Sequence, residues 1–173
     1  MIGVKRFVNI LKKNKITFFT GVPDSVLKSF STYLDKNKIR NIITANEGSA
    51  IALGAGYHLS SKKIAGIYFQ NSGLGNAINP LISIANKSVY NIPLLLIIGW
   101  RGAPKIADEP QHKVKGKITR KLLNLLKVDH LILENESDLL KLDKKIKQSK
   151  NKIIACLIKD KTLKDETLVV KKK

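Results

Sequence analysis

The chain is poor in cysteine, arginine and acidic residues, and it has no long apolar segment. Its single cysteine, Cys156, excludes an internal disulfide and cannot form a metal site alone, so a reduced, cytoplasmic setting is expected. A membrane-spanning helix needs roughly 20 apolar residues. The longest apolar run, 92–98, contains Pro93 and is typical of a buried strand. The lysine-bearing start, 1–14, has no signal-peptide pattern. We therefore predict neither membrane insertion nor export.

The charge is strongly one-sided, with 32 basic and 13 acidic residues and a formal net charge of +19. Such a charge is compatible with nucleic acid, an acidic partner or an anionic substrate. The basic residues include only four arginines, although arginine is the usual reader of base edges. Aromatic residues are not interleaved with the basic ones, as base stacking would require. Both observations count against nucleic-acid binding, and a lysine-biased solvated surface is the simpler interpretation of the charge. A non-catalytic, basic interaction or nucleic-acid-binding module is kept as an alternative.

Short apolar runs alternate with amphipathic stretches along the chain, which predicts strands separated by helices. The predicted strands are 16–20, 41–44, 64–69, 94–98, 130–133 and 153–158, and the predicted helices are 4–13, 24–34, 47–59, 75–86, 118–126 and 136–148. This alternation predicts one α/β domain over residues 1–160, a three-layer αβα arrangement with an open, mostly parallel six-stranded sheet. Residues 161–173 are predicted to form a basic C-terminal tail.

Ligands of open parallel sheets bind beyond the carboxyl ends of the strands. The corresponding loops begin at Gly21, Ala45, Gln70 and Gly99. The first loop reads G-V-P-D-S, from Gly21 to Ser25. Capping of the next helix is enough to explain Asp24 and Ser25, but both also suit contact with a ligand at a helix N-terminus.

Glu47 stands between a predicted strand and a helix rich in Ala and Gly. A glutamate in the first helical turn is favoured by the helix dipole. The surroundings are nevertheless expected to be tight and apolar, where a carboxylate is costly unless it is paired or shares a proton. These residues favour a functional role for Glu47 over capping. Gly48, Gly54 and Gly56 lower helix propensity, so we expect them to permit close backbone approach.

The third loop, Q-N-S-G-L-G-N at 70–76, is similar to glycine-rich turns that bind phosphates. It lacks the G-x-G-x-x-G spacing and the Lys-Ser/Thr pair of a P-loop, so nucleotide binding is weakly supported. Its amide side chains predict a polar pocket floor.

The fourth segment contains G-W-R-G at 99–102 and D-E-P-Q-H at 108–112, within a predicted loop of about 18 residues from Gly99 to Gly116. Arg101 suits a bidentate clamp on a phosphonate, sulfonate or carboxylate. His112 suits proton transfer near neutral pH, although a lone loop histidine is more often a surface residue. Asp108, Glu109 and His112 match no metal-ligand spacing, so no metal site is predicted.

Taken in order, G-V-P-D-S, A-N-E-G, Q-N-S-G-L-G-N, G-W-R-G and D-E-P-Q-H resemble the N-terminal region of phosphonopyruvate decarboxylases, over residues 16–120 and more loosely to 158. The alpha subunit of sulfopyruvate decarboxylase is similar but lacks the D-E-P-Q-H string, so it ranks second. The resemblance implies the pyrimidine-binding domain of a thiamine-diphosphate-dependent enzyme. It implies that Glu47 is catalytic and hydrogen-bonds the N1′ atom of the cofactor. It also implies that Ser72, Gly73, Leu74, Gly75 and Asn76 lie near the cofactor, and that Asp24, Ser25, Arg101 and His112 are candidates for substrate contact or proton transfer.

The same resemblance implies a second domain that binds diphosphate through Mg²⁺ and carries a Gly-Asp-Gly motif. This sequence contains no Gly-Asp-Gly. We therefore expect a separate beta subunit to hold Mg²⁺ and the diphosphate, in a hetero-oligomer with active sites at subunit interfaces. The expected activity is decarboxylation of a small anionic 2-oxo acid, phosphonopyruvate first and sulfopyruvate second. No nucleic-acid or membrane partner is expected.

Overall fold

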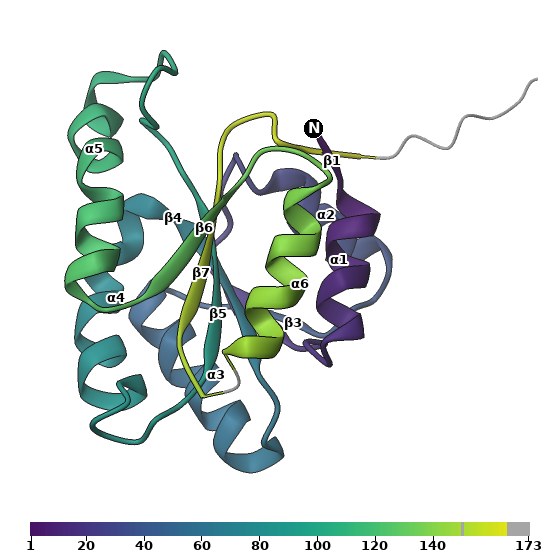
Figure 1. Ribbon diagram of the computed structural model, residues 1–173, viewed down its shortest axis with the longest axis vertical. Helices are drawn as coiled ribbons and strands as arrows, with labels where there is room; N and C mark the ends of the chain where they lie inside the picture. Colours follow the sequence, from purple (N-terminus) through teal and green to yellow (C-terminus); the bar gives the residue numbers. More distant parts are fainter. Residues whose placement is uncertain (150, 166–173) are drawn as a thin grey trace, which may run out of the picture.

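The structure, a computed structural model, describes residues 1–149 and 151–165. Its centre is a parallel sheet of six strands in the order β3-β2-β4-β5-β7-β6 (Figure 1). The strands of this sheet are β2 (Phe19–Gly21), β3 (Asn41–Ile43), β4 (Ala65–Gln70), β5 (Leu94–Gly99), β6 (Asp129–Leu133) and β7 (Ile154–Ile158). The predicted α/β class, with an open parallel sheet of six strands, is confirmed.

Helices cover both faces of the sheet (Figure 1). One layer contains α1 (Val4–Lys13), α2 (Lys28–Lys36) and α6 (Asp138–Gln148). The other layer contains α3 (Glu47–Ser61), the 3₁₀ turn η1 (Asn71–Gly73), α4 (Leu74–Pro80), the π-helical turn η2 (Leu81–Ala85) and α5 (Pro110–Leu125). The three layers follow from the crossover helices that parallel strands require.

The sheet separates two apolar cores, because successive side chains of a strand point to opposite faces. In β5, Leu95 and Ile97 pack towards α1, α2 and α6, whereas Leu96 and Ile98 pack towards α3, α4 and α5. Both faces of β5 are buried, and its continuous apolar sequence follows from that position.

The loop after β5 is shorter than the sequence predicts. Helix α5 begins at Pro110, so most of the D-E-P-Q-H string and Gly116 lie in the helix and not in a loop of about 18 residues. Proline is well tolerated at the first helical position, because its missing N–H would be unpaired there. Gly116 has a packing role: a Cβ at this position would lie 1.8 Å from the carbonyl oxygen of Gly102. The sequence analysis placed Pro110 and Gly116 in the loop, and this was wrong.

Two other helices differ from the prediction in their bounds. Residues 24–27 form a turn before α2, with the N–H of Leu27 donating to the Asp24 carbonyl at 3.1 Å. The predicted helix 75–86 changes at Pro80 from the α-helix α4 to the π-helical turn η2. Proline has no N–H to donate, and such an interruption accommodates its ring.

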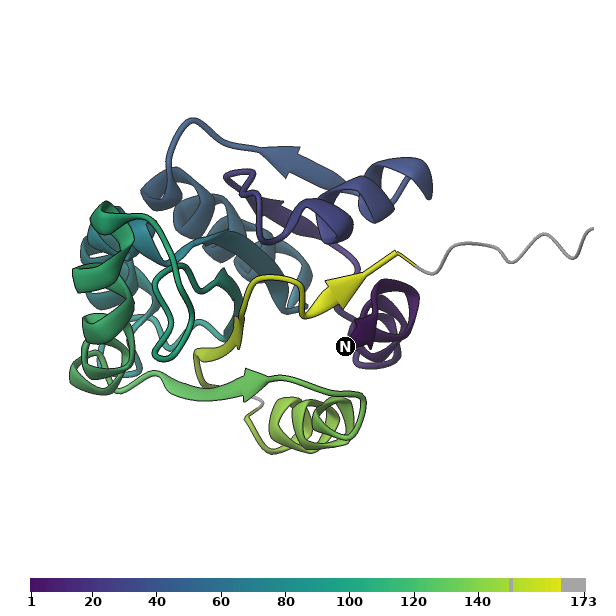
Figure 2. The same cartoon turned by 90° about the horizontal axis from the view of Figure 1, so that it is seen from above.

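The predicted C-terminal tail is ordered at its start. Leu163–Lys164 form strand β8, which pairs in parallel with β1 (Ile2–Gly3) beside the N-terminus (Figure 2). Leu163 joins the core under α1, so apolar burial fixes this part of the chain. The sequence analysis expected a basic tail over 161–173, and at Leu163 and Lys164 the structure shows a strand instead. Positions 166–173 lie outside the described residues. Among the described residues, no helix is long and apolar enough to cross a membrane.

Candidate active site

The site lies at the carboxyl edge of the sheet, where the chain reverses direction across β2. From β2 the chain passes to β3 at the edge, then returns through α3 to β4 on the other side of β2. Such a topological switch point leaves a crevice at the strand ends. The loops after β2, β4 and β5 meet there, since Asp24 contacts Gln70 and Ser25 contacts Arg101. The tertiary structure thus joins segments that are separate in the sequence.

Glu47 is the first residue of α3, and its carboxylate is held by one neutral donor. Asn46 caps the helix by accepting a hydrogen bond from the N–H of Ser49 at 2.9 Å. The Glu47 side chain turns towards α4, where the amide of Asn76 donates to its Oε2 atom at 2.8 Å. Glu47 is 9% exposed, and its Oε1 atom has no hydrogen-bond partner among the described residues. A buried carboxylate with a free oxygen is prepared to bind a further donor.

Gly73 lies against the Glu47 carboxylate. A Cβ at Gly73 would lie 2.2 Å from the Oε1 atom and 2.3 Å from the carboxyl carbon of Glu47. Gly48 has a similar function in helix packing, because its Cβ would lie 3.0 Å from the Asn76 carbonyl oxygen. Gly54 approaches Ile67 in the same way, whereas a Cβ at Gly56 would meet nothing within 4 Å. The prediction of close approach is therefore correct for Gly48 and Gly54 and wrong for Gly56.

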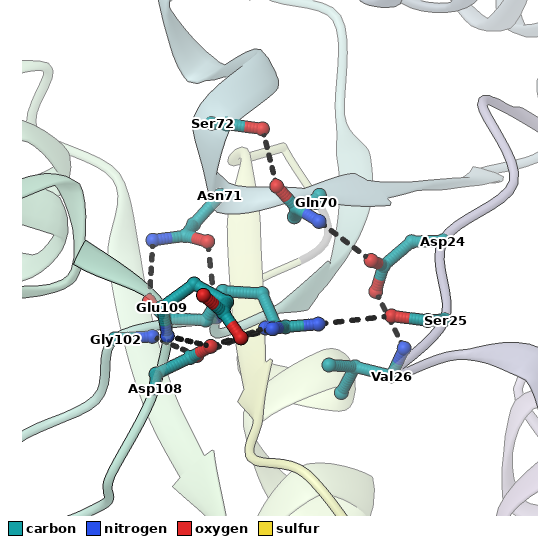
Figure 3. A network of polar contacts seen from close by, with 10 residues as sticks. Asp24, Ser25, Val26, Gln70, Asn71, Ser72, Gly102, Asp108 and Glu109 are labelled. Carbon is teal, nitrogen blue, oxygen red and sulfur yellow. Dashed lines mark hydrogen bonds and ion pairs between the residues drawn. The ribbon is translucent and has the colours of Figure 1, made fainter. Parts of the chain in front are cut away.

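A chain of hydrogen bonds links the first and third loops (Figure 3). The Ser72 hydroxyl donates to Gln70 Oε1 at 2.6 Å, and Gln70 Nε2 donates to Asp24 Oδ1 at 2.9 Å. Asp24 Oδ2 accepts from the N–H of Val26 at 3.1 Å. Because an ionised carboxylate only accepts, Asp24 fixes the orientation of the Gln70 amide, which in turn directs the Ser72 hydroxyl.

Arg101 is held by Asp108 and Ser25. Its Nε donates to both carboxylate oxygens of Asp108, at 2.9 and 3.1 Å, and its Nη1 donates to the Ser25 hydroxyl at 3.2 Å. The hydrogen bonds from Arg101 hold the pKa of Asp108 well below its usual range, and the N–H groups of Gly102 and Glu109 act in the same direction. The same contact raises the pKa of Arg101. An anionic ligand would thus compete with Asp108 for the guanidinium group.

A cavity of about 430 Å³ lies beside this ion pair, bounded by the 106–109 loop and Asp160. Its charged lining comprises Arg101 and the carboxylates of Asp108, Glu109 and Asp160. Carboxylates outnumber the cation, so the cavity does not bind an anion well while Arg101 is paired with Asp108. No group of three potential metal ligands exists among the described residues.

Asn71 and Thr119 hold the backbone of the site. The sequence analysis included Asn71 only among the amides of a polar pocket floor and did not single out Thr119. The Asn71 side chain accepts from the Arg101 N–H and donates to the Arg101 carbonyl, both at 3.0 Å. It also donates to the Thr119 hydroxyl on α5 at 2.9 Å. Asn71 thereby fixes the backbone of Arg101 against α5. Its place beside the predicted site residues in Q-N-S-G-L-G-N was an available signal, but Thr119 had none.

The remaining predicted site residues occupy different environments. Leu74 is buried in the core between α3, α4 and the sheet. A Cβ at Gly75 would meet nothing within 4 Å, so this backbone faces open space. His112 lies in the first turn of α5 and not in a loop, with its carbonyl against Gly102. Its Nδ1 atom is buried without a partner among the described residues.

Residues 1–124 match the family model described as thiamine pyrophosphate enzyme, N-terminal TPP binding domain. The chain belongs to this family. A phosphonopyruvate decarboxylase of Streptomyces viridochromogenes is 36% identical over 80% of the chain. The sulfopyruvate decarboxylase subunit alpha of Methanocaldococcus jannaschii is also 36% identical, over 74% of the chain. The benzoylformate decarboxylase structure of Polynucleobacter necessarius covers 91% of the chain with a TM-score of 0.68 and 18% identity, which shows the fold.

The phosphonopyruvate decarboxylases and the sulfopyruvate decarboxylase alpha subunits differ in how much of their length this chain spans. The chain spans about a third of the phosphonopyruvate decarboxylases, 34% and 31% of two such proteins from Streptomyces. It spans 74% of the Methanocaldococcus jannaschii alpha subunit and 75% of that of Methanococcus maripaludis. The benzoylformate decarboxylase is also longer, because the chain covers 29% of it.

Proposed function

We propose that this chain is the pyrimidine-binding subunit of a thiamine-diphosphate-dependent 2-oxo acid decarboxylase, with phosphonopyruvate as the first candidate substrate. The observation that carries the proposal is the Glu47 carboxylate, nearly buried at the switch point, with Oε1 left without a partner. This arrangement fits a cofactor ring that presents a nitrogen to a carboxylate. Gly73 supports the fit, since a larger residue there would displace Glu47.

The cofactor supplies the electron sink that decarboxylation of a 2-oxo acid requires. The contribution of this chain is to orient and polarise. When the cofactor is bound, Glu47 would hold a proton at N1′ of the pyrimidine, and Asn76 would keep the carboxylate in position through its bond to Oε2. Asp24 and Gln70 would orient the Ser72 hydroxyl through their hydrogen bonds. The backbone at Gly75 would leave open space for the cofactor. Arg101 and Ser25 would contact the anionic end of the substrate, which must replace Asp108 as the partner of the guanidinium group. His112 is the remaining candidate for proton transfer.

The relatives support a separate diphosphate-binding subunit, because the chain spans three quarters of two proteins that are themselves named as alpha subunits. The given residues contain no Gly-Asp-Gly motif of their own. Mg²⁺ and the diphosphate would then be held by the partner, with the active site at the subunit interface. The coverage also supports a second candidate, the alpha subunit of sulfopyruvate decarboxylase. The D-E-P-Q-H string favours phosphonopyruvate. The single cysteine remains the basis for a reduced, cytoplasmic location.

The test is reconstitution with a companion polypeptide that carries Gly-Asp-Gly and a later Asn. We expect CO₂ release from phosphonopyruvate to exceed release from sulfopyruvate, and to require both chains, thiamine diphosphate and Mg²⁺. Glu47→Gln should lower kcat by roughly 100-fold or more, as expected for loss of a general acid–base group. Its thermal unfolding temperature and its association with the partner should stay close to the wild-type values. Near-normal turnover by this variant would contradict the proposal.

A further inference from the structure

The outer face of α5 carries an apolar stripe that no described residue covers. Val114, Ile118 and Leu125 are 67%, 46% and 78% exposed. At about 100° per residue, these positions lie within about 40° of one another around the helix. The buried face of α5 is formed by Gly116, Thr119 and Leu123, on the opposite side. The helix therefore has a second, largely apolar face in addition to the one that packs on the sheet, and Lys121 lies on this face between Ile118 and Leu125.

The stripe ends in a groove between α5 and the end of the α4–η2 segment. The groove has a volume of about 880 Å³, and its apolar lining includes Leu122, Leu125 and Ile82, the last of which is 46% exposed. A concave apolar surface of this kind is typical of a protein contact and is uncommon on a fully solvated face.

The charge around the groove and the stripe is positive and unopposed. Helix α5 contains no acidic residue, and the groove is lined by three lysines, Lys87, Lys127 and Lys152. The acidic residue in the lining, Asp129, pairs with Lys145 at 2.6 Å. None of the three lysines forms an ion pair within the described part of the chain. A partner that presents apolar side chains flanked by carboxylates would complement this surface.

We propose that the α5 stripe and the groove dock the diphosphate-binding subunit through an apolar surface flanked by carboxylates. This inference rests on the proposed function, which requires such a subunit. The surface belongs to the helical layer of the active site, because α4 carries Asn76 at one end and continues into η2 at the groove. The groove lies at the amino edge of the sheet, beside the starts of β6 and β7, so a partner that covers Glu47 at the carboxyl edge would reach it by extending along the α5 stripe. A second copy of this chain fits poorly, since its lysines would face lysines.

The experiment measures the Kd between the full chain and the companion polypeptide that carries Gly-Asp-Gly. Leu125→Asp places a charge where the stripe meets the groove, and its matched control is Leu140→Asp, a leucine 70% exposed on α6 in the opposite layer. Loss of a central interface contact typically weakens binding by about tenfold or more. We therefore expect at least this change for Leu125→Asp and little change for Leu140→Asp. Thermal unfolding of both variants verifies that they are folded.

A second pair of variants tests the charge. Lys87→Glu with Lys152→Glu reverses two groove cations, and Lys12→Glu with Lys144→Glu makes the same change in net charge on the opposite layer. We expect the groove double variant to raise the Kd for the companion polypeptide more than the control double variant does. The groove double variant should also make this Kd less dependent on salt. Equal Kd values for stripe, groove and control variants would overturn the docking site. Leu125-dependent binding to anionic lipid vesicles, with unchanged Kd for the partner, would overturn it as well.

These results are separable from a failure of the proposed function. If Glu47→Gln turns over normally, the catalytic assignment fails whatever the stripe does. If Leu125→Asp binds the partner normally while Glu47→Gln is inactive, the docking site fails and the catalytic assignment stands.

Discussion

Glu47 shows how one residue combines helix initiation with a buried carboxylate. Its place in the first turn of α3 is favourable for a carboxylate, because the helix dipole stabilises negative charge there. The side chain is buried, and within the described part of the chain it accepts one hydrogen bond, from Asn76. A buried carboxylate with one oxygen unpaired can accept a further donor, which in our proposal is the cofactor ring.

The contact between Gly73 and Glu47 gives a prediction at the residue scale. Gly73 has φ −75° and ψ −7°, which alanine adopts freely, so Gly73→Ala tests the Cβ alone. The added carbon would displace the Glu47 carboxylate, and misplacement by about 1 Å costs up to 100-fold in rate. We expect kcat of the reconstituted enzyme to fall by roughly 10- to 100-fold.

The matched control for this variant is Gly56→Ala in α3, where a Cβ meets nothing within 4 Å. It should keep wild-type turnover and gain up to about 1 kcal/mol in the free energy of unfolding from helix propensity. Equal turnover of the two variants would refute the role of Gly73 in holding Glu47.

At the scale of elements, α1 and α6 are joined by one carboxylate. Asp143 accepts from Lys147 and from Asn14, each at 2.7 Å, and lies 3.5 Å from Lys13. The hydrogen bond from Lys147, followed by that from Asn14, lowers the pKa of Asp143 to about 2. An aspartate in an unfolded chain titrates near 3.9, so the contribution of Asp143 to stability is complete above that pH and is lost as the pH falls towards 2.

The resulting prediction concerns acid unfolding. Asp143→Asn should be less stable than wild type at neutral pH, and the difference should shrink between about pH 4 and pH 2. Urea unfolding at several pH values measures this. Asp35→Asn, on the exposed side of α2, makes the same change in charge and serves as the control. It should lower the stability at neutral pH less than Asp143→Asn does. A constant difference between Asp143→Asn and wild type across this range would contradict the assignment.

The loop between β5 and α5 is also held by hydrogen bonds to a single carboxylate, that of Asp108. Asp108 receives hydrogen bonds from the Arg101 side chain and from the N–H of Gly102. Gly102 has φ +64°, a conformation that favours glycine, and its carbonyl lies against Gly116 of α5. The loop is therefore fixed to the helix by backbone contact, and the Arg101 side chain is held in one position by Asp108.

At the scale of the whole molecule, the two cores meet at the central strands. Cys156 of β7 is completely buried between the sheet and the layer of α1, α2 and α6. This burial raises the pKa of its thiol to about 12, so at neutral pH the group is neutral and unreactive.

The single cysteine is thus a reporter of global unfolding. We expect a thiol reagent to leave the native chain unmodified. As the urea concentration rises, labelling of Cys156, measured by absorbance, should follow the unfolding transition measured by circular dichroism. Because the sequence has one cysteine, the signal has one source. Rapid labelling without denaturant would show that the core opens locally around β7.

The charge of +19 is also a property of the whole molecule. The basic residues are spread over both helical layers, whereas the large exposed apolar side chains of α5 and η2 occur on the layer that carries Glu47. A nucleic-acid-binding module would not require this apolar surface. The combination favours a protein partner.

The sequence alone determined the order of strands and helices, the parallel α/β class and the position of Glu47, because these depend on local periodicity and on short motifs. It did not determine where α5 begins or that the start of the tail forms β8. Gly116 and Leu163 have meaning only through their contacts with Gly102 and with β1. The tertiary structure alone decided that Gly73 lies under Glu47, that Gln70 joins Ser72 to Asp24, and that Arg101 is paired with Asp108. These contacts arise where parallel strands bring distant loops to one edge, and no local pattern specifies them.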